Sequence, residues 1–246
     1  MLNKFKFTLK EIDVVDSTNN YLRALDFKRL KTGYCVLAEY QSGGKGQRGK
    51  IWKSAPGENL TFSFFLELGQ LPPSHQFKLL QLVSLSVLNT VNKLTGVKAN
   101  IKWPNDIMVN RQKVAGILIE NFIQQGKLNS VVGIGINVNQ INFDNYTPKA
   151  ISLRLLCNEI FNTKLVLSLF EHEFSKLFEK LSPGHGELEQ SYRNELYAMG
   201  EMHDFETSEG KYMVAEVLGV DRFGRLILNV DGHPKAFLNG EVRWLF

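Results

Sequence analysis

The sequence predicts a fold that combines helices with a largely antiparallel sheet, followed by a small β-barrel. Short strand-like segments follow one another between residues 100 and 138, with tight turns between them. Strands joined in this way pair antiparallel, because a parallel return needs a long crossover. After about residue 200 the pattern changes to short strands separated by turns at 221–224, 231–232 and 239–240, which is typical of a small barrel.

The first half of the chain contains the strongest helix signal. Asp16–Asn20 (DSTNN) resembles a helix start, because Asp and Ser are good N-caps, and strands are expected at 34–40 and 60–68. Apolar residues recur at helical spacing over 74–96, where Ser74 is a candidate cap and Gly96 a candidate end. Further apolar residues widen this face, so the helix is expected to be largely buried.

The remaining elements follow from the same periodicities, and they divide the chain at about residue 200. The predicted domains are 1–200 and 201–246. The expected elements are strands at 100–103, 106–109, 113–120 and 129–138, helices at 165–181 and 187–197, and strands at 212–219, 225–230, 235–238 and 242–246.

The composition is that of a globular protein with a substantial core. Apolar residues make up 43% of the 246, charged residues 22%, and the net charge of +4 suits an anionic ligand. Two distant cysteines predict reduced thiols and a cytoplasmic location. The sequence has neither a signal-peptide pattern nor an apolar run that could cross a membrane. His172 and Glu173 begin an H-E-x-x-H pattern that Lys176 breaks, so no metal-ligating residues are expected.

The stretch GGKGQRGKIW at 43–52 comes close to two phosphate-binding motifs. Gly44, Gly46 and Gly49 spell G-x-G-x-x-G, and with Lys50 they give most of a Walker A loop. However, Ile51 stands where a Walker loop needs Ser or Thr. Both motifs also need a helix directly behind the glycines, whereas the residues that follow include a Pro-Gly pair and lack helical periodicity. We therefore reject both interpretations.

The same stretch still favours an anion-binding loop. It holds four glycines, and four cations, Lys45, Arg48, Lys50 and Lys53, lie within or just after it. Glycine clusters mark places where the backbone must approach a ligand closely, and free amides beside cations can cradle an anion without a helix. The alternative is an ordinary solvated basic loop.

A second polar cluster surrounds the hairpin in KWPNDIMVNRQKVAGILIE, residues 102–120. It contains Lys102, Asn105, Asp106 and Lys113, although Lys113 and Asp106 could also be ordinary turn residues. Gly116 in this segment, and Gly133 and Gly135 in VVGIGINVN, interrupt apolar strands, where glycine often marks the close approach of a ligand. Asn137 offers a neutral amide suited to a base edge. These strands suggest one shared groove.

Taken together, Ser17-Thr18-Asn19, AEYQSGGKGQRGKIW, KWPNDIMVNRQKVAGILIE and GIGINVN resemble the blocks of the biotin protein ligases, in the family's order. The resemblance implies an α+β catalytic domain over 1–200, with a mixed sheet backed by helices, and an SH3-like barrel over 201–246. It implies that biotin and ATP, with Mg²⁺, form biotinyl-5′-AMP. The biotin then passes to a lysine of a biotin carboxyl carrier protein or domain. Because the blocks begin near residue 12, we expect a stand-alone ligase that binds neither DNA nor a membrane, and a homodimer is possible.

The resemblance also implies roles for individual residues. Lys113, Arg48 and Asp106 are the expected catalytic residues, with Lys113 bridging the biotin carboxyl group and the phosphate and Asp106 orienting or deprotonating the acceptor amine. The expected biotin-binding residues are Ser17, Thr18, Asn19, Gln41, Gly44, Lys45, Gly46, Gln47, Lys113, Gly116, Gly133 and Gly135. The expected ATP-binding residues are Lys45, Arg48, Lys50, Trp52, Asn105 and Asn137.

The loop departs from the family's usual G-R-G-R-x-G-R pattern. The position of the second arginine is Gln47, which is the departure that matters, and the position of the first is Lys45. Glutamine carries no charge, so we expect Gln47→Arg to slow the escape of the adenylate. We also expect the 43–53 loop to be disordered without ligand and to fold over the adenylate.

Three other functions remain as alternatives. A lipoate or octanoate ligase or transferase shares the family's fold but lacks the KWPND and glycine–lysine set. A non-enzymatic nucleic-acid-binding protein would use the basic loop and the barrel, and its binding would weaken steeply with salt. An oxidoreductase built on G-x-G-x-x-G lacks the helix that this motif needs.

Overall fold

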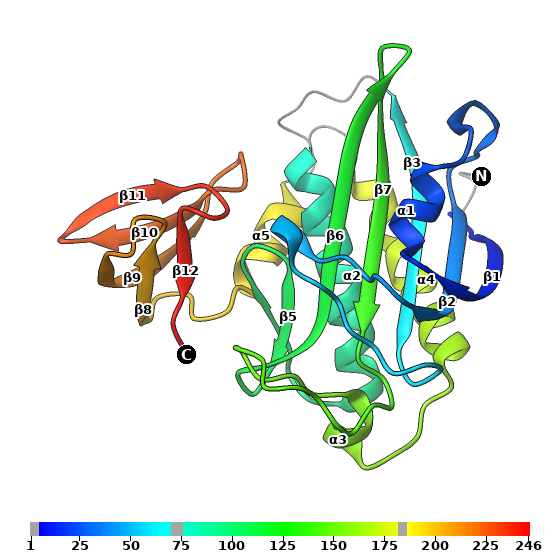
Figure 1. Ribbon diagram of the computed structural model, residues 1–246. Coiled ribbons are helices and arrows are strands. Elements are labelled where there is room, and N and C mark those ends of the chain that lie inside the picture. Colours follow the sequence, from blue (N-terminus) through cyan, green and yellow to red (C-terminus); the bar gives the residue numbers. More distant parts are fainter. Residues whose placement is uncertain (1–4, 70–75, 182–185) are drawn as a thin grey trace.

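The computed structural model describes residues 5–69, 76–181 and 186–246. It contains a seven-stranded sheet covered by helices and, beside it, a separate five-stranded sheet formed by the end of the chain (Figure 1). The candidate Ser74 cap lies outside the described residues.

The large sheet runs in the order β1-β2-β3-β7-β6-β5-β4. Only β1 and β2 pair in parallel, and every other neighbouring pair is antiparallel. The strands are β1 (Thr8–Val15), β2 (Tyr34–Gln41), β3 (Leu60–Gly69), β4 (Asn100–Lys102), β5 (Asp106–Val109), β6 (Gln112–Gln124) and β7 (Lys127–Ile136).

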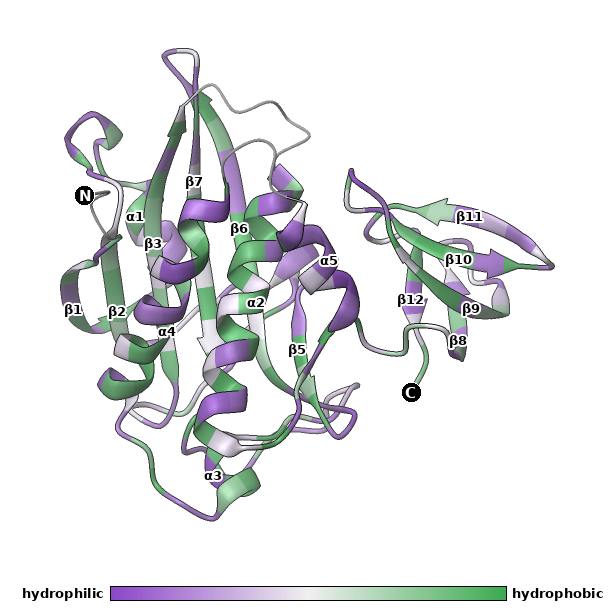
Figure 2. Cartoon of the chain, turned by 180° about the vertical axis from the view of Figure 1, so that it is seen from behind, coloured by the Kyte–Doolittle hydropathy of each residue, from purple (hydrophilic) through white to green (hydrophobic). Residues whose placement is uncertain are grey.

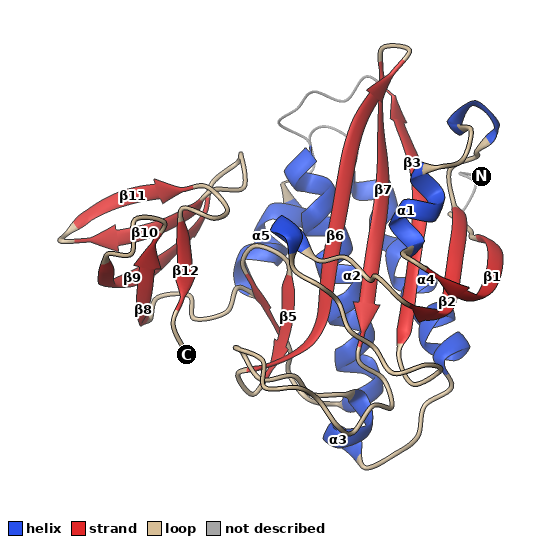
Figure 3. Ribbon diagram, viewed as in Figure 1, coloured by secondary structure: helices blue, strands red, loops and turns tan. Residues whose placement is uncertain are grey.

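Helices cover the two faces of this sheet unequally. Helices α2 (Gln76–Thr95) and α4 (Thr163–Phe178) lie behind it with α5 (Glu187–Asn194), whereas α1 (Thr18–Arg23) lies on the front face (Figures 1 and 3). Seen from behind, the helices turn many hydrophilic residues outward (Figure 2). The short α3 (Leu153–Cys157) follows the long connection after β7.

The main core fills the space between the large sheet and α2 and α4. Helix α2 buries residues on more than one face, as its wide apolar stripe predicts, and it contacts both α4 and α5. A cluster of phenylalanine rings, including Phe62, Phe64, Phe170 and Phe174, joins β3 to α4. The main core therefore lies behind the sheet, and the front face carries α1 and the candidate functional site.

The small sheet has the order β11-β10-β9-β8-β12, and all of its pairs are antiparallel. Its strands are β8 (Met202–Thr207), β9 (Tyr212–Val220), β10 (Leu226–Val230), β11 (His233–Phe237) and β12 (Val242–Trp244). Trp103 of the KWPND segment packs into its core and donates its indole N–H to the carbonyl of Gly224 at 2.8 Å. The two sheets are therefore joined through a residue next to the predicted hairpin.

The predicted fold class is confirmed, including the largely antiparallel sheet and the small C-terminal β domain. The five strands form an open sheet rather than a closed barrel, which remains compatible with an SH3-like fold. Among the described elements, β1, β8 and α3 were not predicted, nor were the short 3₁₀ helices at Phe27–Arg29 and Gln47–Gly49. No helix in the described part of the chain is long and apolar enough to span a membrane.

Candidate functional site

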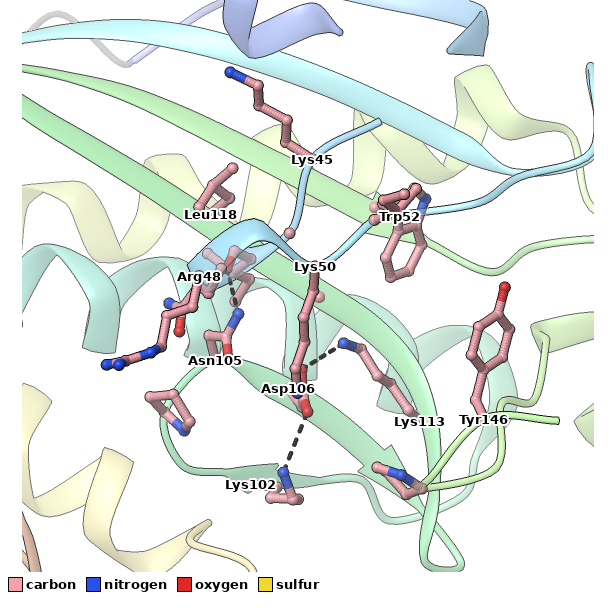
Figure 4. A pocket seen from close by; sticks show the side chains of 18 of the residues that line it. Lys45, Arg48, Lys50, Trp52, Lys102, Asn105, Asp106, Lys113, Leu118 and Tyr146 are labelled. Atoms are coloured by element: carbon pink, nitrogen blue, oxygen red, sulfur yellow. Dashed lines mark hydrogen bonds and ion pairs between the residues drawn. The ribbon is translucent and has the colours of Figure 1, made fainter. Parts of the chain in front are cut away.

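A pocket of about 590 Å³ opens on the front of the large sheet and extends to the small sheet. Its walls come from the start of α1, the end of β2, the glycine-rich loop, the KWPND hairpin, β6, β7 and the strands around β12. Sequence segments from Ser17 to Phe246 thus meet at one place, and part of the pocket is seen from close by in Figure 4.

Three charged side chains of the hairpin form a group inside the pocket. Asp106 lies between two lysines, with its Oδ1 2.6 Å from Lys113 Nζ and its Oδ2 3.3 Å from Lys102 Nζ (Figure 4). The hairpin turn at Asn110–Arg111 takes positive φ at both residues, as a tight two-residue hairpin requires. This turn brings Lys113 back beside Asp106.

The charges of this group depend on one another. Burial alone would raise the pKa of Asp106, but Lys113 and Lys102 beside the carboxylate hold that pKa below its usual range. Burial lowers the pKa of Lys102, and Asp106 offsets this shift only in part. Asp106 is therefore a carboxylate that stabilises two cations in the free protein.

The glycine-rich loop folds into a small closed structure. The amide of Gly46 donates to the Lys50 carbonyl at 2.7 Å, and the amide of Trp52 donates to the Gly44 carbonyl at 2.9 Å. Between them, Gln47–Gly49 form a short 3₁₀ turn. Lys50 extends toward Asp106, whereas the ammonium group of Lys45 points away from it (Figure 4). The predicted change between a disordered and a folded loop stays a prediction.

Trp52, at the end of this loop, lies against the strand glycines. A Cβ at Gly135 would overlap the indole ring, and one at Gly116 would lie within 3.1 Å of it. Lys113 Nζ lies 5.6 Å from the centre of the ring, a distance that permits a cation–π interaction. Gly116 and Gly135 therefore allow another group to approach these strands closely. In the described structure that group is the indole ring of Trp52.

A chain of buried polar contacts forms another wall of the pocket. Gln41 Oε1 accepts hydrogen bonds from the amide and the hydroxyl of Thr18, at 2.8 and 3.1 Å. Ser63 Oγ bonds to Thr18 and donates to Asn19 Oδ1, both at 2.6 Å. Asn19 in turn donates to Glu120 at 2.7 Å, so these side chains are fixed before any ligand arrives.

Asn105 and Asn137 also line the pocket, but some of their side-chain N–H groups already donate hydrogen bonds within the protein. Asn105 Nδ2 donates to the Ile117 carbonyl at 2.7 Å. Asn137 Nδ2 donates to the carbonyls of Lys113 and Ile151, at 3.3 and 3.1 Å. The amide oxygen of Asn137 is the atom with capacity left for a ligand.

The small sheet contributes a fourth wall. Trp244 and Phe246 carry rings whose centres lie 5.9 and 5.7 Å from Lys102 Nζ. Glu206 forms an ion pair with Arg243. Arg48 of the glycine-rich loop reaches this sheet and donates to the Asn239 carbonyl at 2.6 Å.

The structure brings together nearly all of the residues that the sequence singled out. The pocket is lined by all of the residues expected to be catalytic, to bind ATP and to bind biotin, except Gly44. This glycine lines a neighbouring depression, and a Cβ there would overlap the Trp52 carbonyl oxygen. Gly133 is covered by Asn19, whose amide would overlap a Cβ there.

Some residues of the site were not predicted from the sequence. Ser63 and Glu120 carry the polar chain, and Asn239 and Gly240 belong to the small sheet. Lys102 was noticed beside the hairpin but given no role. Glu120 closes the KVAGILIE segment, so its place in that block was the one available signal.

Metal binding by the protein alone has no support in the described residues, where no group of three or more His, Cys, Asp or Glu side chains could hold an ion. The cations of the pocket can instead neutralise an anionic ligand, while its buried amides and hydroxyls can bind polar groups. The arrangement suits the joining of two anionic reactants at one place.

Comparison with known proteins agrees with this chemistry. The model of the biotin/lipoate A/B protein ligase family matches residues 11–137. The bifunctional ligase/repressor BirA of Escherichia coli is 32% identical over 94% of this chain and 72% of its own length. The biotin–[acetyl-CoA-carboxylase] ligase of Mycobacterium tuberculosis is 27% identical over 85% of this chain and 78% of its own.

A solved structure has the same fold. The biotin protein ligase from Aquifex aeolicus in complex with biotin and ATP superposes with a TM-score of 0.80, at 26% sequence identity, over 96% of this chain and 99% of that one. The match includes the small sheet as well as the large one, since it covers nearly the whole of both chains.

Proposed function

This chain belongs to the biotin/lipoate A/B protein ligase family and, within it, to the biotin protein ligases, and we propose that the pocket around Lys113 is where its reaction takes place. The reaction has two steps: the chain condenses biotin with ATP and then attaches the biotin to a carrier lysine. It is a biotin–[acetyl-CoA-carboxylase] ligase. The observation that carries the proposal is that Lys113, the glycine-rich loop and the polar chain at Gln41 line one pocket. The relatives favour biotin over lipoate or octanoate and an enzyme over a nucleic-acid-binding protein.

In the first step the biotin carboxylate attacks the α-phosphate of ATP and pyrophosphate leaves. The two reactants are anions that repel each other, so the site must neutralise and align them. Lys113 lines the pocket and bridges the carboxylate and the phosphate. Asp106, 2.6 Å from its ammonium group, holds that group in position before the substrates bind.

The cations of the glycine-rich loop hold the phosphates. Lys50 extends toward the Asp106 group, and Arg48 and Lys45 flank it in the same loop. Gly46 and Gln47 complete the loop and contact the biotin side of the adenylate. Gly44 supports the loop from behind, through its hydrogen bond with Trp52.

The head group of biotin binds against the buried polar chain. Ser17, Thr18, Asn19 and Gln41 hydrogen-bond the ureido ring, and Gly116, Gly133 and Gly135 form the slot for the rest of biotin. Because Trp52 lies against two of these glycines in the described structure, the indole ring moves aside or forms one wall when biotin binds. A site built from buried polar groups rejects analogues that lack their partners.

The adenine binds near Trp52, Asn105 and Asn137. The amide oxygen of Asn137 accepts from the exocyclic amine, since its N–H groups are used by backbone carbonyls. Mg²⁺ was expected with ATP. The described residues contain no group of three or more His, Cys, Asp or Glu side chains that could hold a metal ion, and Asp106 and Glu206 face cations of the protein. We therefore assign no residue and no step to the metal.

In the second step the carrier lysine attacks the acyl carbon of biotinyl-5′-AMP and AMP leaves. An amine has an ordinary pKa of about 10.4 and must lose a proton to attack. Asp106 orients the amine and accepts this proton. Its low pKa makes it a weak base while both lysines face it, so binding of the adenylate must draw Lys113 away first.

The wider context is also part of the proposal. Residues 1–200 act as the catalytic domain and 201–246 as the C-terminal β domain, and the partner is the biotin carboxyl carrier protein of a carboxylase. The ligase acts in the cytoplasm, as the two free cysteines suggest, without binding DNA or a membrane. Homodimerisation is a further part of the proposal.

Biotin-dependent exchange of labelled pyrophosphate into ATP tests the first step. Transfer of labelled biotin to a purified carrier domain tests the second. We expect both, and a carrier whose acceptor lysine is replaced by arginine should stay unlabelled. Exchange that depends on lipoate instead of biotin would overturn the assignment.

A further inference from the structure

We propose that the Asn239–Gly240 turn of the small sheet is a latch that holds the glycine-rich loop closed through Gln47 and Arg48. This latch sets how long biotinyl-5′-AMP stays in the pocket. The inference rests on the proposed function, because it concerns the release of the intermediate that the first step forms.

Two hydrogen bonds join the latch to the loop in opposite directions. The Arg48 guanidinium donates to the carbonyl of Asn239 at 2.6 Å. The side-chain amide of Asn239 donates to Gln47 Oε1 at 2.8 Å. Asn239 therefore accepts a hydrogen bond from Arg48 and donates another to Gln47. Because these two loop residues are adjacent, the two bonds together fix the position and the orientation of the loop tip.

Gly240 makes the contact with Arg48 possible. Its φ of +91° lies in the region that favours glycine, and a Cβ there would overlap the Arg48 guanidinium. Gly232, at the preceding turn of the same sheet, has a similar φ of +80° but open space where its Cβ would stand. The two glycines thus share a backbone requirement, and only Gly240 also makes room for the loop.

The backbone of Arg48 supports this interpretation. Arg48 has φ 54° and ψ 43°, a left-handed conformation that costs a non-glycine residue free energy and persists when surrounding contacts hold it. The contacts made by its side chain and by Gln47 run to the small sheet. The latch therefore stabilises the strained tip of the loop.

Holding the tip also restrains the rest of the loop. The hydrogen bonds from Gly46 to Lys50 and from Trp52 to Gly44 make the loop a closed unit. Lys50 and Trp52 line the pocket from this unit. An adenylate beneath them can leave only when the loop opens, and opening breaks both bonds to Asn239.

The glutamine at position 47 suits the hydrogen bond with Asn239. Glutamine has a carbonyl oxygen that accepts from Asn239, whereas an arginine side chain has donors alone. The departure of Gln47 from the arginine pattern therefore exchanges a charge in the loop for a hydrogen bond to the small sheet.

The rate at which labelled biotinyl-5′-AMP leaves the enzyme tests the latch. It is measured after an excess of unlabelled biotinyl-5′-AMP is added, without carrier protein. We expect Gly240→Ala to speed release about tenfold, since two hydrogen bonds are disturbed, and Asn239→Ala about threefold. Gly232→Ala is the matched control, with the same backbone strain and no contact to the loop, and it should release at the rate of the unsubstituted protein.

A double-mutant cycle keeps the test valid if Gly240→Ala fails to fold. Gln47→Ala and Asn239→Ala remove the same side-chain hydrogen bond, so the double variant should release the adenylate no faster than the faster single variant. Release from Asn239→Ala at the unsubstituted rate, or additive effects in the cycle, would overturn the latch. Failure of the unsubstituted protein to form any biotinyl-5′-AMP would instead overturn the proposed function.

Discussion

The carboxylate of Asp106 lies 2.6 Å from the ammonium group of Lys113, across the hairpin that brings β6 back beside β5. The same carboxylate faces Lys102 at 3.3 Å. One buried anion therefore positions Lys113, the lysine proposed to bridge the two reactants, and compensates the charge of Lys102. This relationship leads to two of the predictions below.

Replacing Lys113 by alanine should reduce biotin-dependent pyrophosphate exchange at least about 100-fold, because no cation would then bridge the two anionic reactants. Lys127→Ala removes a lysine from an exposed ion pair at the β6–β7 turn, and it should exchange at the rate of the unsubstituted protein. Equal exchange rates in the two variants would show that Lys113 is not the bridging group.

Asp106→Asn should lower the free energy of unfolding at pH 7 by about 3 kcal/mol, because it leaves two neighbouring cations without their buried counter-charge. Lys113 and Lys102 hold the pKa of Asp106 below its usual range. The carboxylate therefore stabilises the fold above the unfolded-state pKa of about 3.9, and this contribution is lost as the pH falls through the folded-state pKa.

Chemical denaturation at several pH values measures this difference. The gap between Asp106→Asn and the unsubstituted protein should be constant from pH 7 to 5 and should narrow below about pH 4. Glu67→Gln, which removes an exposed partner of Lys127, should change stability by less than about 1 kcal/mol. A gap that widens on acidification would contradict the assigned direction of the shift.

Gln47→Arg should speed the release of biotinyl-5′-AMP. From charge alone, the sequence predicts the opposite result. The structure changes this expectation, because an arginine cannot accept the hydrogen bond from Asn239 and would stand beside Arg48. The chase described for the latch measures the rate, and slower release would show that phosphate charge outweighs the contact with Asn239.

Gly135→Ala should displace Trp52, since the added Cβ would overlap the indole ring. We expect a shift in tryptophan fluorescence and roughly tenfold weaker ATP binding, because Trp52 belongs to the proposed adenine site. Gly186→Ala adds a Cβ in open space and should change neither signal. Unchanged fluorescence in Gly135→Ala would mean that Trp52 does not rest on this strand in solution.

Much of the fold follows from periodicity and turn chemistry. The helix expected at 74–96 is found at Gln76–Thr95, and the strands of the hairpins lie within a few residues of their predicted ranges. The strand β1 was missed because Thr8–Val15 is largely exposed and does not alternate strictly, since Lys10 and Glu11 are adjacent and so are Val14 and Val15. It forms by pairing in parallel with β2, a long-range contact that local periodicity does not reveal.

Residues of the candidate site could be predicted where a charged side chain lies within a recognisable local sequence pattern. Lys113, Asp106 and the loop cations stand out because glycines or a hairpin accompany them. Ser63 and Asn239 do not, since a serine in an apolar strand and an asparagine in a turn are ordinary there. Their roles arise from neighbours far away in the chain, at Asn19 and Gln47.

The contribution of the small sheet to the pocket has a consequence for biosynthesis. On the ribosome, N-terminal parts of a chain emerge and fold first, so the strands that carry Lys113 and Gln41 can assemble while Asn239 and Phe246 are still untranslated. A nascent chain at that stage has the groove for the vitamin but lacks the wall that holds the loop. On the proposed mechanism, activation of the vitamin therefore has to wait until residues 239–246 emerge and dock.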